Sequence, residues 1–146
     1  HGTYGVAAIG LYLLFRVTAI GAVAAYNPLA AGAIWLASTV IGRSASLWVS
    51  VALPNAREGG ASASVGRVSR RAFLGGMGFA VLLAFVLAAP FTSVVAVILS
   101  LAVTAGLAAA WVWTCRRLIG GQTGDLIGAL QALIEIAVLT VLLVFV

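Results

Sequence analysis

Five long apolar segments follow one another along this chain, and they restrict it to one kind of fold. The segments cover residues 5–26, 29–53, 72–89, 91–115 and 126–146. Each is close to the ~20 residues that an α-helix, rising about 1.5 Å per residue, needs to cross a hydrocarbon layer about 30 Å thick. A backbone inside a bilayer must satisfy its own hydrogen bonds, and a helix does so internally. The sequence therefore predicts an all-α, polytopic membrane protein with about five transmembrane helices.

Composition supports the same fold class. Hydrophobic residues make up 64% of the 146 residues and charged residues 8%, whereas about a quarter of the residues in a soluble domain are charged. Small residues recur inside the apolar segments, as in the stretch GGMG at 75–78, and they let helices approach closely. We expect a tight bundle that forms one transmembrane domain over residues 1–146. Because the chain starts at His1 rather than at a methionine, we expect this domain to be the carboxyl-terminal part of a longer protein.

The arginines predict how the bundle is oriented. Asn27-Pro28 and Pro90-Phe91 are predicted to form tight turns between consecutive segments. The start of the chain, residues 54–71 and residues 116–125 must then share the opposite face of the membrane. Six of the eight arginines lie on that face, which the positive-inside rule assigns to the cytoplasm. We therefore expect an integral protein of a bacterial or archaeal cytoplasmic (inner) membrane.

Three charged residues remain inside the apolar segments: Arg16, Arg43 and Glu135. Counted at helical rise from the loops of the arginine-rich face, each lies roughly 15–17 Å deep, so we expect them to share one level. Charges inside a bilayer are costly, and they usually face a partner or a water-filled cavity. Two interpretations follow: a structural cluster that holds the helices together, or the floor of a polar cavity that accepts an anionic ligand.

A glycine-rich loop, GGQTGD at residues 120–125, leads into the last apolar segment. Its glycines permit positive φ and let backbone N–H groups approach an anion closely. Thr123 and Asp125 are residue types that cap the start of a helix. Asp125 is also able to ligate a hard cation such as Mg²⁺. The local sequence leaves both capping and cation binding open for this aspartate.

Three separated stretches resemble the cobalamin synthase family, the adenosylcobinamide-GDP ribazoletransferases. The stretch GGQTGDLIGALQALIE at 120–135 is similar to a Gly-Gly-x-Thr-Gly-Asp loop followed by a Gly-Ala pair and a glutamate. HGTYG at the start resembles the opening of a membrane helix in that family. Arg43 and the later LPNAREGG resemble its arginine followed by Pro-x-Ala-Arg-x-Gly-Gly. The matching residues in the first stretch are Gly120, Gly121, Thr123, Gly124, Asp125, Gly128, Ala129 and Glu135.

The resemblance also has gaps. Before the region that HGTYG resembles, the family carries an aspartate-rich segment of the Asp-Gly-x-Ala-Asp kind and a Lys-Asp pair, and neither is in this chain. Gln131-Ala132 stands where the family pattern leads us to expect an acidic or amide residue at the second position. We therefore expect the carboxyl-terminal part of a longer membrane enzyme, which holds the basic and glycine-rich half of the site. An amino-terminal half or a homo-oligomer would complete it.

What the resemblance implies is a Mg²⁺-dependent transferase of the last steps of cobalamin (vitamin B12) biosynthesis. The family joins adenosylcobinamide-GDP to α-ribazole or its 5′-phosphate and releases GMP, a phosphoryl transfer that depends on positioning and on charge stabilisation. Carried onto this sequence, it assigns Asp125 and Arg57 to catalysis, with Asp125 as the metal ligand. The residues assigned to substrate binding are Arg43, Gly120, Gly121, Thr123, Gly124 and Tyr4, and the structural or site-floor charges are Arg16 and Glu135. The expected partners are the two substrates and the lipid bilayer, without nucleic acid.

Two other functions are compatible with the sequence. A small ion-coupled membrane transporter would use Glu135 as a proton carrier within the membrane, tuned by Arg16 and Arg43. A helical subunit would only scaffold a larger complex. An aspartate-rich motif in the upstream coding sequence would favour the enzyme over both.

Overall fold

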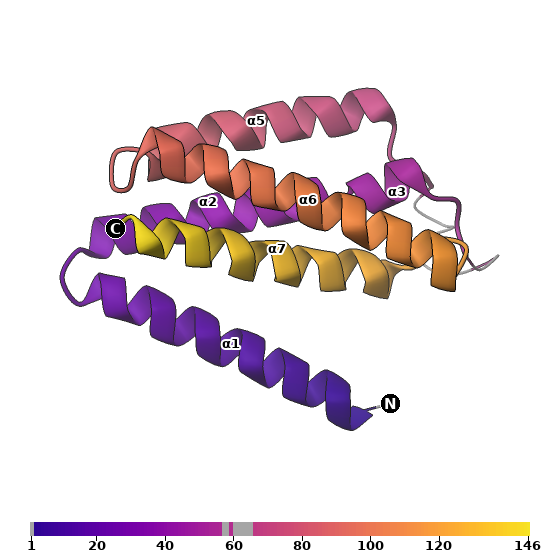
Figure 1. Ribbon diagram of the computed structural model, residues 1–146, viewed down its shortest axis with the longest axis horizontal. Coiled ribbons are helices and arrows are strands. Elements are labelled where there is room, and N and C mark those ends of the chain that lie inside the picture. The colour runs from indigo at the N-terminus through magenta and orange to yellow at the C-terminus, as the bar shows by residue number, and fades with distance from the viewer. Residues whose placement is uncertain (1, 57–58, 60–65) are drawn as a thin grey trace.

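The computed structural model describes residues 2–56, 59 and 66–146. In chain order the helices are α1 (Gly2–Ala24), α2 (Pro28–Ser46), α3 (Trp48–Ala52), α5 (Arg70–Ala88), α6 (Val94–Leu118) and α7 (Gly124–Val144). Five spans are long and apolar enough to cross a membrane, with α2 and α3 together forming the span Pro28–Ala52. Figure 1 shows these helices running lengthwise in an elongated bundle. The predicted all-α fold with five spanning segments is confirmed.

Polar side chains fix where the helices begin. Asn27 Oδ1 accepts a hydrogen bond from the Ala30 amide at 3.1 Å, and Pro28 stands in the first turn of α2, where a missing amide costs nothing. Equivalent caps at the starts of α5, α6 and α7 come from Ser69, Ser93 and Thr123. A cap satisfies an amide that the helix leaves unpaired, so it sets the first helical residue. The fourth span therefore begins at Val94, three residues after the start of the predicted segment.

The second predicted segment is not one continuous helix. α2 ends at Ser46 and α3 starts at Trp48, with Leu47 between them. The Ser46 hydroxyl donates to the Arg43 carbonyl at 3.1 Å. A serine that bonds back to its own helix competes with the backbone ladder and favours a bend.

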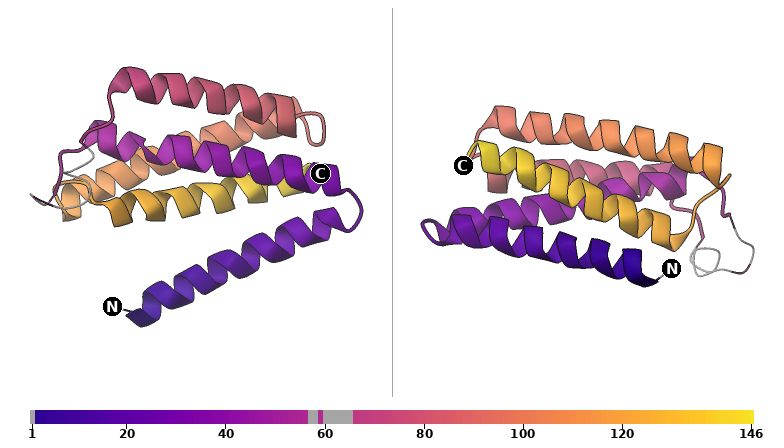
Figure 2. Two further views of the ribbon diagram at one scale, coloured as in Figure 1. Left: turned by 180° about the vertical axis from the view of Figure 1, so that it is seen from behind. Right: turned by 60° about the horizontal axis from the view of Figure 1, so that its bottom comes forward.

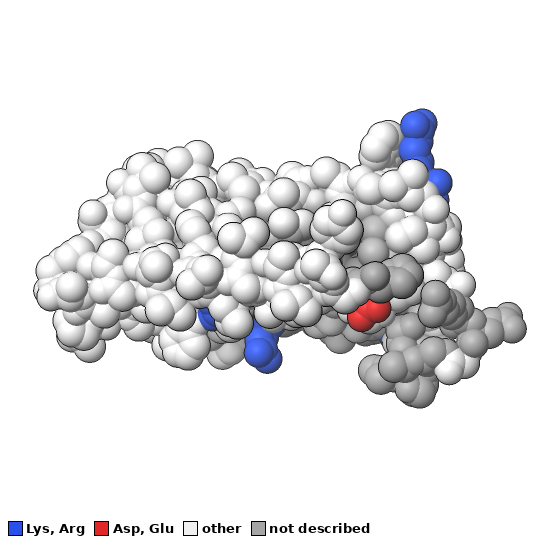
Figure 3. Space-filling view, turned by 90° about the horizontal axis from the view of Figure 1, so that it is seen from below, with Lys and Arg blue, Asp and Glu red and all other residues white. Residues whose placement is uncertain are grey.

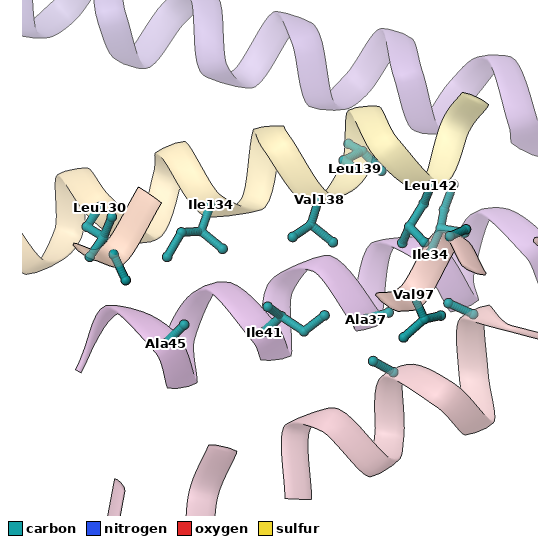
Figure 4. Close-up of a cluster of buried hydrophobic side chains, with 14 of the residues drawn as sticks. Ile34, Ala37, Ile41, Ala45, Val97, Leu130, Ile134, Val138, Leu139 and Leu142 are labelled. Carbon is teal, nitrogen blue, oxygen red and sulfur yellow. The ribbon is translucent and has the colours of Figure 1, made fainter. Parts of the chain in front are cut away.

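The core lies where α2, α6 and α7 meet. α2 packs against both α5 and α7, and Figure 4 shows branched side chains of α7 facing α2. The buried side chains labelled there are Ile34, Ala37, Ile41, Ala45, Val97, Leu130, Ile134, Val138, Leu139 and Leu142. Because lipid tails are as apolar as leucine, helices in a membrane associate through the closeness of such packing rather than through burial from water.

α1 lies on the outside of the bundle. In Figures 1 and 2 it is close to α2 at the turn before Pro28 and diverges from the other helices toward the amino terminus. It contacts α2 and α7, and Val23 is the buried residue of α1. The first half of α1 therefore stands apart from the packed core.

Three parts of the chain lie at one end of the bundle, as the sequence predicts. The start of α1, the residues 53–56 that follow α3 and the loop between α6 and α7 are at the right in Figure 1, whereas the carboxyl terminus and the other two turns are at the left. The described residues after α3 and the loop before α7 are thus at the same end of the bundle.

Candidate active site

Two loops at this end of the bundle are joined by backbone hydrogen bonds. The Gln122 amide donates to the Pro54 carbonyl at 2.8 Å, and the Ala56 amide donates to the Gln122 carbonyl at 2.9 Å. These bonds form an isolated parallel bridge between Asn55 and Gln122. The Pro-Asn-Ala stretch and the GGQTGD loop are therefore held side by side, although 67 residues separate Asn55 from Gln122.

Two neighbouring glycines permit this contact for different reasons. Gly120 has a φ of +78°, a conformation that glycine adopts without a side-chain penalty. Gly121 is needed for space: a Cβ there would lie 2.8 Å from the Pro54 carbonyl oxygen and 2.8 Å from the Ala56 amide nitrogen. These are backbone atoms that no side-chain rotation can move. The absent side chain of Gly121 is therefore what lets the two loops approach.

The Gln122 side chain fastens the two loops from inside. It is 1% exposed, and its Nε2 donates to Asn55 Oδ1 at 2.9 Å and to Ser50 Oγ at 3.4 Å. Ser50 Oγ also accepts from the Val68 amide at 3.2 Å, so a third segment joins the contact. Gln122 Oε1 is buried and has no hydrogen-bond partner in the structure as described. The sequence assigned no role to Gln122 because it occupies the variable position of the Gly-Gly-x-Thr-Gly-Asp pattern.

Thr123, rather than Asp125, caps α7. Thr123 Oγ1 accepts from the Leu126 amide at 3.4 Å, whereas Asp125 is an exposed residue in the first helical turn. A carboxylate in that turn is stabilised by the unpaired amides and the dipole of the helix start. The Asp125 carboxylate is thus accessible at the start of α7.

Asp125 is a carboxylate at the loop end of the bundle that a metal ion could reach. Within residues 2–56, 59 and 66–146, no group of three or more histidine, cysteine, aspartate or glutamate side chains is placed to hold a metal ion. Mg²⁺ is, however, commonly bound through one or two carboxylates together with substrate phosphates and water. Asp125 is suited to supply such a carboxylate to a cation that arrives with a diphosphate.

Inside the membrane, charged and polar side chains form a network between α1, α2 and α7. Arg16 Nη1 lies 3.0 Å from Glu135 Oε2. The Tyr12 hydroxyl donates to the same carboxylate and accepts from Arg16 Nη1 at 2.5 Å. Gln131 Nε2 donates to Glu135 Oε1 at 3.0 Å, and Arg16 Nη2 donates to Thr39 Oγ1 at 3.3 Å. Glu135 is 2% exposed, so these neighbours replace water as partners of its charge.

Arg43 stands apart from this network. It is exposed on α2, and the ion pair seen among the described residues joins Arg16 and Glu135 without it. The neighbouring Gly42 is the residue that faces Glu135. The three charges were expected to lie together at one depth. The structure instead shows an ion pair between Arg16 and Glu135 and an arginine, Arg43, that lies apart from it. In Figure 3 basic side chains appear at separate places along the bundle, and an acidic group is visible near the loop end.

A groove of ≈ 680 Å³ runs between α1 and α7. Four residues that the family resemblance singled out line it: Gly124, Asp125, Gly128 and Ala129. Tyr12 of the intramembrane network lines it as well. Tyr4 is 88% exposed and is not one of the lining residues.

The sequence and the structure agree on some of the site. The two loops and Asp125 come together at one end, whereas Arg57 lies outside the described residues. Tyr12 and Thr39 had no assigned role, although Tyr12 stands four residues before Arg16, as Gln131 does before Glu135. That spacing places both members of each pair on one helix face, and it is the signal that would have found Tyr12.

Known proteins provide an independent comparison. The chain matches the cobalamin-5-phosphate synthase family over residues 1–143. An adenosylcobinamide-GDP ribazoletransferase of Azorhizobium caulinodans is 35% identical over 99% of this chain and 54% of the relative. Proteins of the same name from Rhizobium meliloti and Syntrophobacter fumaroxidans are 39% and 33% identical, over 94% and 95% of this chain and 53% and 54% of the relatives. No solved structure matches the chain.

These matches extend over almost the whole chain, while the chain spans about half the length of the curated relatives it matches. They include all three stretches on which the resemblance rests: the HGTYG start, the Pro-x-Ala-Arg-x-Gly-Gly loop and the GGQTGD loop. The chain belongs to the cobalamin-5-phosphate synthase family.

Proposed function

We propose that the enzyme to which this chain contributes transfers cobinamide phosphate from adenosylcobinamide-GDP to α-ribazole or its 5′-phosphate and releases GMP. The observation that carries this proposal is the backbone bridge between Asn55 and Gln122. It joins the loop whose sequence continues into Arg57 to the loop that leads to Asp125. The names of the curated relatives mention adenosylcobinamide-GDP and ribazole, which supports this choice of substrates.

The reaction exchanges a phosphoanhydride bond for a phosphoester bond. A ribose hydroxyl oxygen attacks the phosphorus that carries cobinamide, and the bond from that phosphorus to the oxygen shared with GMP breaks. GMP leaves with the shared oxygen, and the hydroxyl proton passes to a base or to solvent. Because the 5′ oxygen of ribazole 5′-phosphate is already esterified, the nucleophile for that acceptor must be another ribose hydroxyl.

The negative diphosphate needs positive charge from a cation and from arginines, and the cation needs a carboxylate ligand. When bound, Mg²⁺ would neutralise negative charge on the phosphoryl oxygens, and Asp125 would hold it. Arg57 and Arg43 are proposed to bind phosphate oxygens, since a guanidinium offers two parallel donors and stays charged. We propose that these groups face the cytoplasm and that an amino-terminal half or a second copy completes the site.

The transporter alternative receives less support from the geometry. A proton carrier must release and regain its proton as it works. Glu135 is paired with Arg16 at 3.0 Å and hydrogen-bonded by Tyr12 and Gln131. A buried carboxylate whose oxygens are already engaged by these three side chains fits a structural role better.

The test is product formation by the enzyme as the cell produces it, reconstituted in lipid nanodiscs. Asp125→Asn is expected to lower kcat by at least about 100-fold, as loss of a charge-stabilising group does, with only a small change in melting temperature because the helix start loses a favourable charge. Arg43→Ala is expected to abolish transfer, and Arg43→Lys to reduce it moderately because lysine keeps the charge but loses the planar fork. Arg117→Ala is the control, since that guanidinium lies over the Trp113 ring at 4.7 Å.

The outcomes separate the function from the assignments. If the unmodified enzyme forms no product with either ribazole acceptor, the proposed function is wrong. If it is active and Asp125→Asn or Arg43→Ala is equally active, the function stands and that residue loses its role.

A further inference from the structure

The groove between α1 and α7 has the size and lining of a ligand pocket. Its volume, ≈ 680 Å³, lies within the range of about 300–1,000 Å³ that small-molecule sites in proteins occupy. Small residues line both of its walls: Gly5 and Ala8 from α1, and Gly124, Gly128, Ala129 and Ala132 from α7. Neither wall carries a protruding side chain at these positions, which suits a flat ligand.

The glycines of the groove keep space open rather than bring helices into contact. A Cβ at Gly5, Gly124 or Gly128 would meet no other heavy atom within 4 Å. At Gly42, by contrast, a Cβ would lie 2.6 Å from Glu135 Cγ, because two helices touch there. Close packing therefore explains Gly42, whereas Gly5, Gly124 and Gly128 leave open space beside their helices.

Polar groups stand at opposite ends of the groove. Asp125, in the first turn of α7, lies at the loop end, and it is the charged residue among those described as lining the groove. Tyr12 is further along α1, and its hydroxyl is held between Arg16 and Glu135. Apolar side chains such as Ile9 and Leu133 lie along the walls. A complementary ligand has a flat apolar body and a neutral, hydroxyl-bearing end.

Both substrates of the proposed reaction contain a nucleoside, but they differ in charge and size, since the nucleosides of adenosylcobinamide-GDP are joined to a diphosphate or to the large corrinoid. The diphosphate of adenosylcobinamide-GDP is anionic, so a carboxylate attracts it only through an intervening cation. α-Ribazole is a nucleoside, with a flat aromatic base and ribose hydroxyls that are able to donate to a carboxylate. We infer that the groove between α1 and α7 binds the aromatic base of α-ribazole, with the ribose directed toward Asp125. This inference rests on the proposed function and assigns one substrate to one place in the fold.

A lipid acyl chain is the competing occupant, since the groove lies between membrane-spanning helices. An acyl chain makes no use of the Asp125 carboxylate at the loop end or of the fixed Tyr12 hydroxyl. The nucleoside contacts the Asp125 carboxylate through its ribose hydroxyls. Its ribose then lies beside the diphosphate-bound cation that Asp125 is proposed to hold.

The experiment fills the groove from both walls in the native enzyme in lipid nanodiscs. Gly128→Leu and Gly5→Leu place a side chain in open space, and leucine is favoured over glycine in a helix. Gly106→Leu on α6 is the matched control, because a Cβ there also meets nothing within 4 Å and Gly106 is not a groove residue. Steady-state rates are measured while one substrate is varied and the other is saturating, and binding of radiolabelled α-ribazole is measured directly.

Both groove variants are expected to raise KM for α-ribazole at least about tenfold, the scale at which one misplaced methylene changes specificity. KM for adenosylcobinamide-GDP should stay within about twofold, and Gly106→Leu should change neither. Unchanged KM for α-ribazole in both groove variants overturns the inference and leaves the groove to lipid. A rise confined to KM for adenosylcobinamide-GDP overturns it as well.

Direct binding keeps the inference separate from the proposed function. If the native enzyme binds α-ribazole and Gly128→Leu does not, the groove assignment holds even where no transfer is detected. If the native enzyme transfers cobinamide phosphate and all variants bind α-ribazole alike, the function stands and the groove assignment fails.

Discussion

At the scale of single residues, Glu135 is the charge on which the attachment of α1 depends most. The carboxylate is buried on α7, and two of its partners, Tyr12 and Arg16, come from α1. α1 itself has one buried residue, Val23, at its far end. Polar contacts at Glu135 therefore hold the middle of α1, where apolar packing is sparse.

Replacing Glu135 tests this directly. Glu135→Gln is expected to lower the free energy of unfolding by about 3–5 kcal/mol, because it leaves the Arg16 cation without its counter-charge in a low-dielectric environment. Denaturant unfolding in detergent micelles measures the change. The double variant Arg16→Met with Glu135→Met removes both charges and is expected to recover most of the loss. Equal stability of Glu135→Gln and the unmodified protein would contradict the structural role of the pair.

For single residues, charge was the clearest signal in the sequence. A charge inside an apolar run must find a partner, so Arg16 and Glu135 were predictable as a structural pair or a cavity floor. Gln122 and Thr39 are neutral, and the sequence alone does not show which neutral polar side chains form hydrogen bonds with each other in the folded protein. Arg43 was grouped with the pair by depth alone, and depth does not determine the side of a helix on which a residue lies.

At the scale of elements, the contact between α2 and α7 depends on one small residue. A Cβ at Gly42 would lie 2.6 Å from Glu135 Cγ and 3.2 Å from the Gln131 carbonyl oxygen. The first atom belongs to a side chain held by three hydrogen-bonding or charged partners, and the second belongs to the backbone of α7. Neither is free to give way, so a larger residue must push the helices apart.

Gly42→Ala is accordingly expected to reduce the free energy of unfolding by about 1–3 kcal/mol, the usual cost of overpacking. Gly32→Ala on the same helix is the control, because a Cβ there meets nothing within 4 Å and alanine favours the helix. The same unfolding titration measures both variants. Should Gly42→Ala prove as stable as Gly32→Ala, α2 and α7 would have to be farther apart than the structure places them.

At the scale of the whole molecule, the hydrophobic pattern was enough to predict five spans and which loops share an end. That pattern shows only which residues avoid water, so it contains no information about how a helix tilts. Neither the divergence of α1 nor the break at Leu47 is visible in that pattern. The groove between α1 and α7 results from the tilt of α1. The sequence therefore identified Gly128 as part of a family pattern but could not predict that it lines a groove.

Orientation in the membrane is a further property of the whole molecule. Five described arginines lie at or next to the loop end of the bundle: Arg67, Arg70, Arg71, Arg116 and Arg117. The turns at 24–30 and 88–94 and the carboxyl-terminal residues 143–146 contain none. Arginine left on the cytoplasmic side during insertion produces this asymmetry, so the loop end is expected to face the cytoplasm.

Cysteine labelling decides that orientation. In a Cys115→Ala background, which removes the chain's one cysteine, Ala56→Cys and Ile119→Cys place exposed thiols at the loop end, and Tyr26→Cys places one at the other end. An impermeant maleimide should label the first two only in inverted vesicles and Tyr26→Cys only in right-side-out vesicles, because the reagent does not cross the bilayer. Labelling of Ala56→Cys and Ile119→Cys from opposite sides would separate the two loops that the Asn55–Gln122 bridge joins, and the proposed active site could not form.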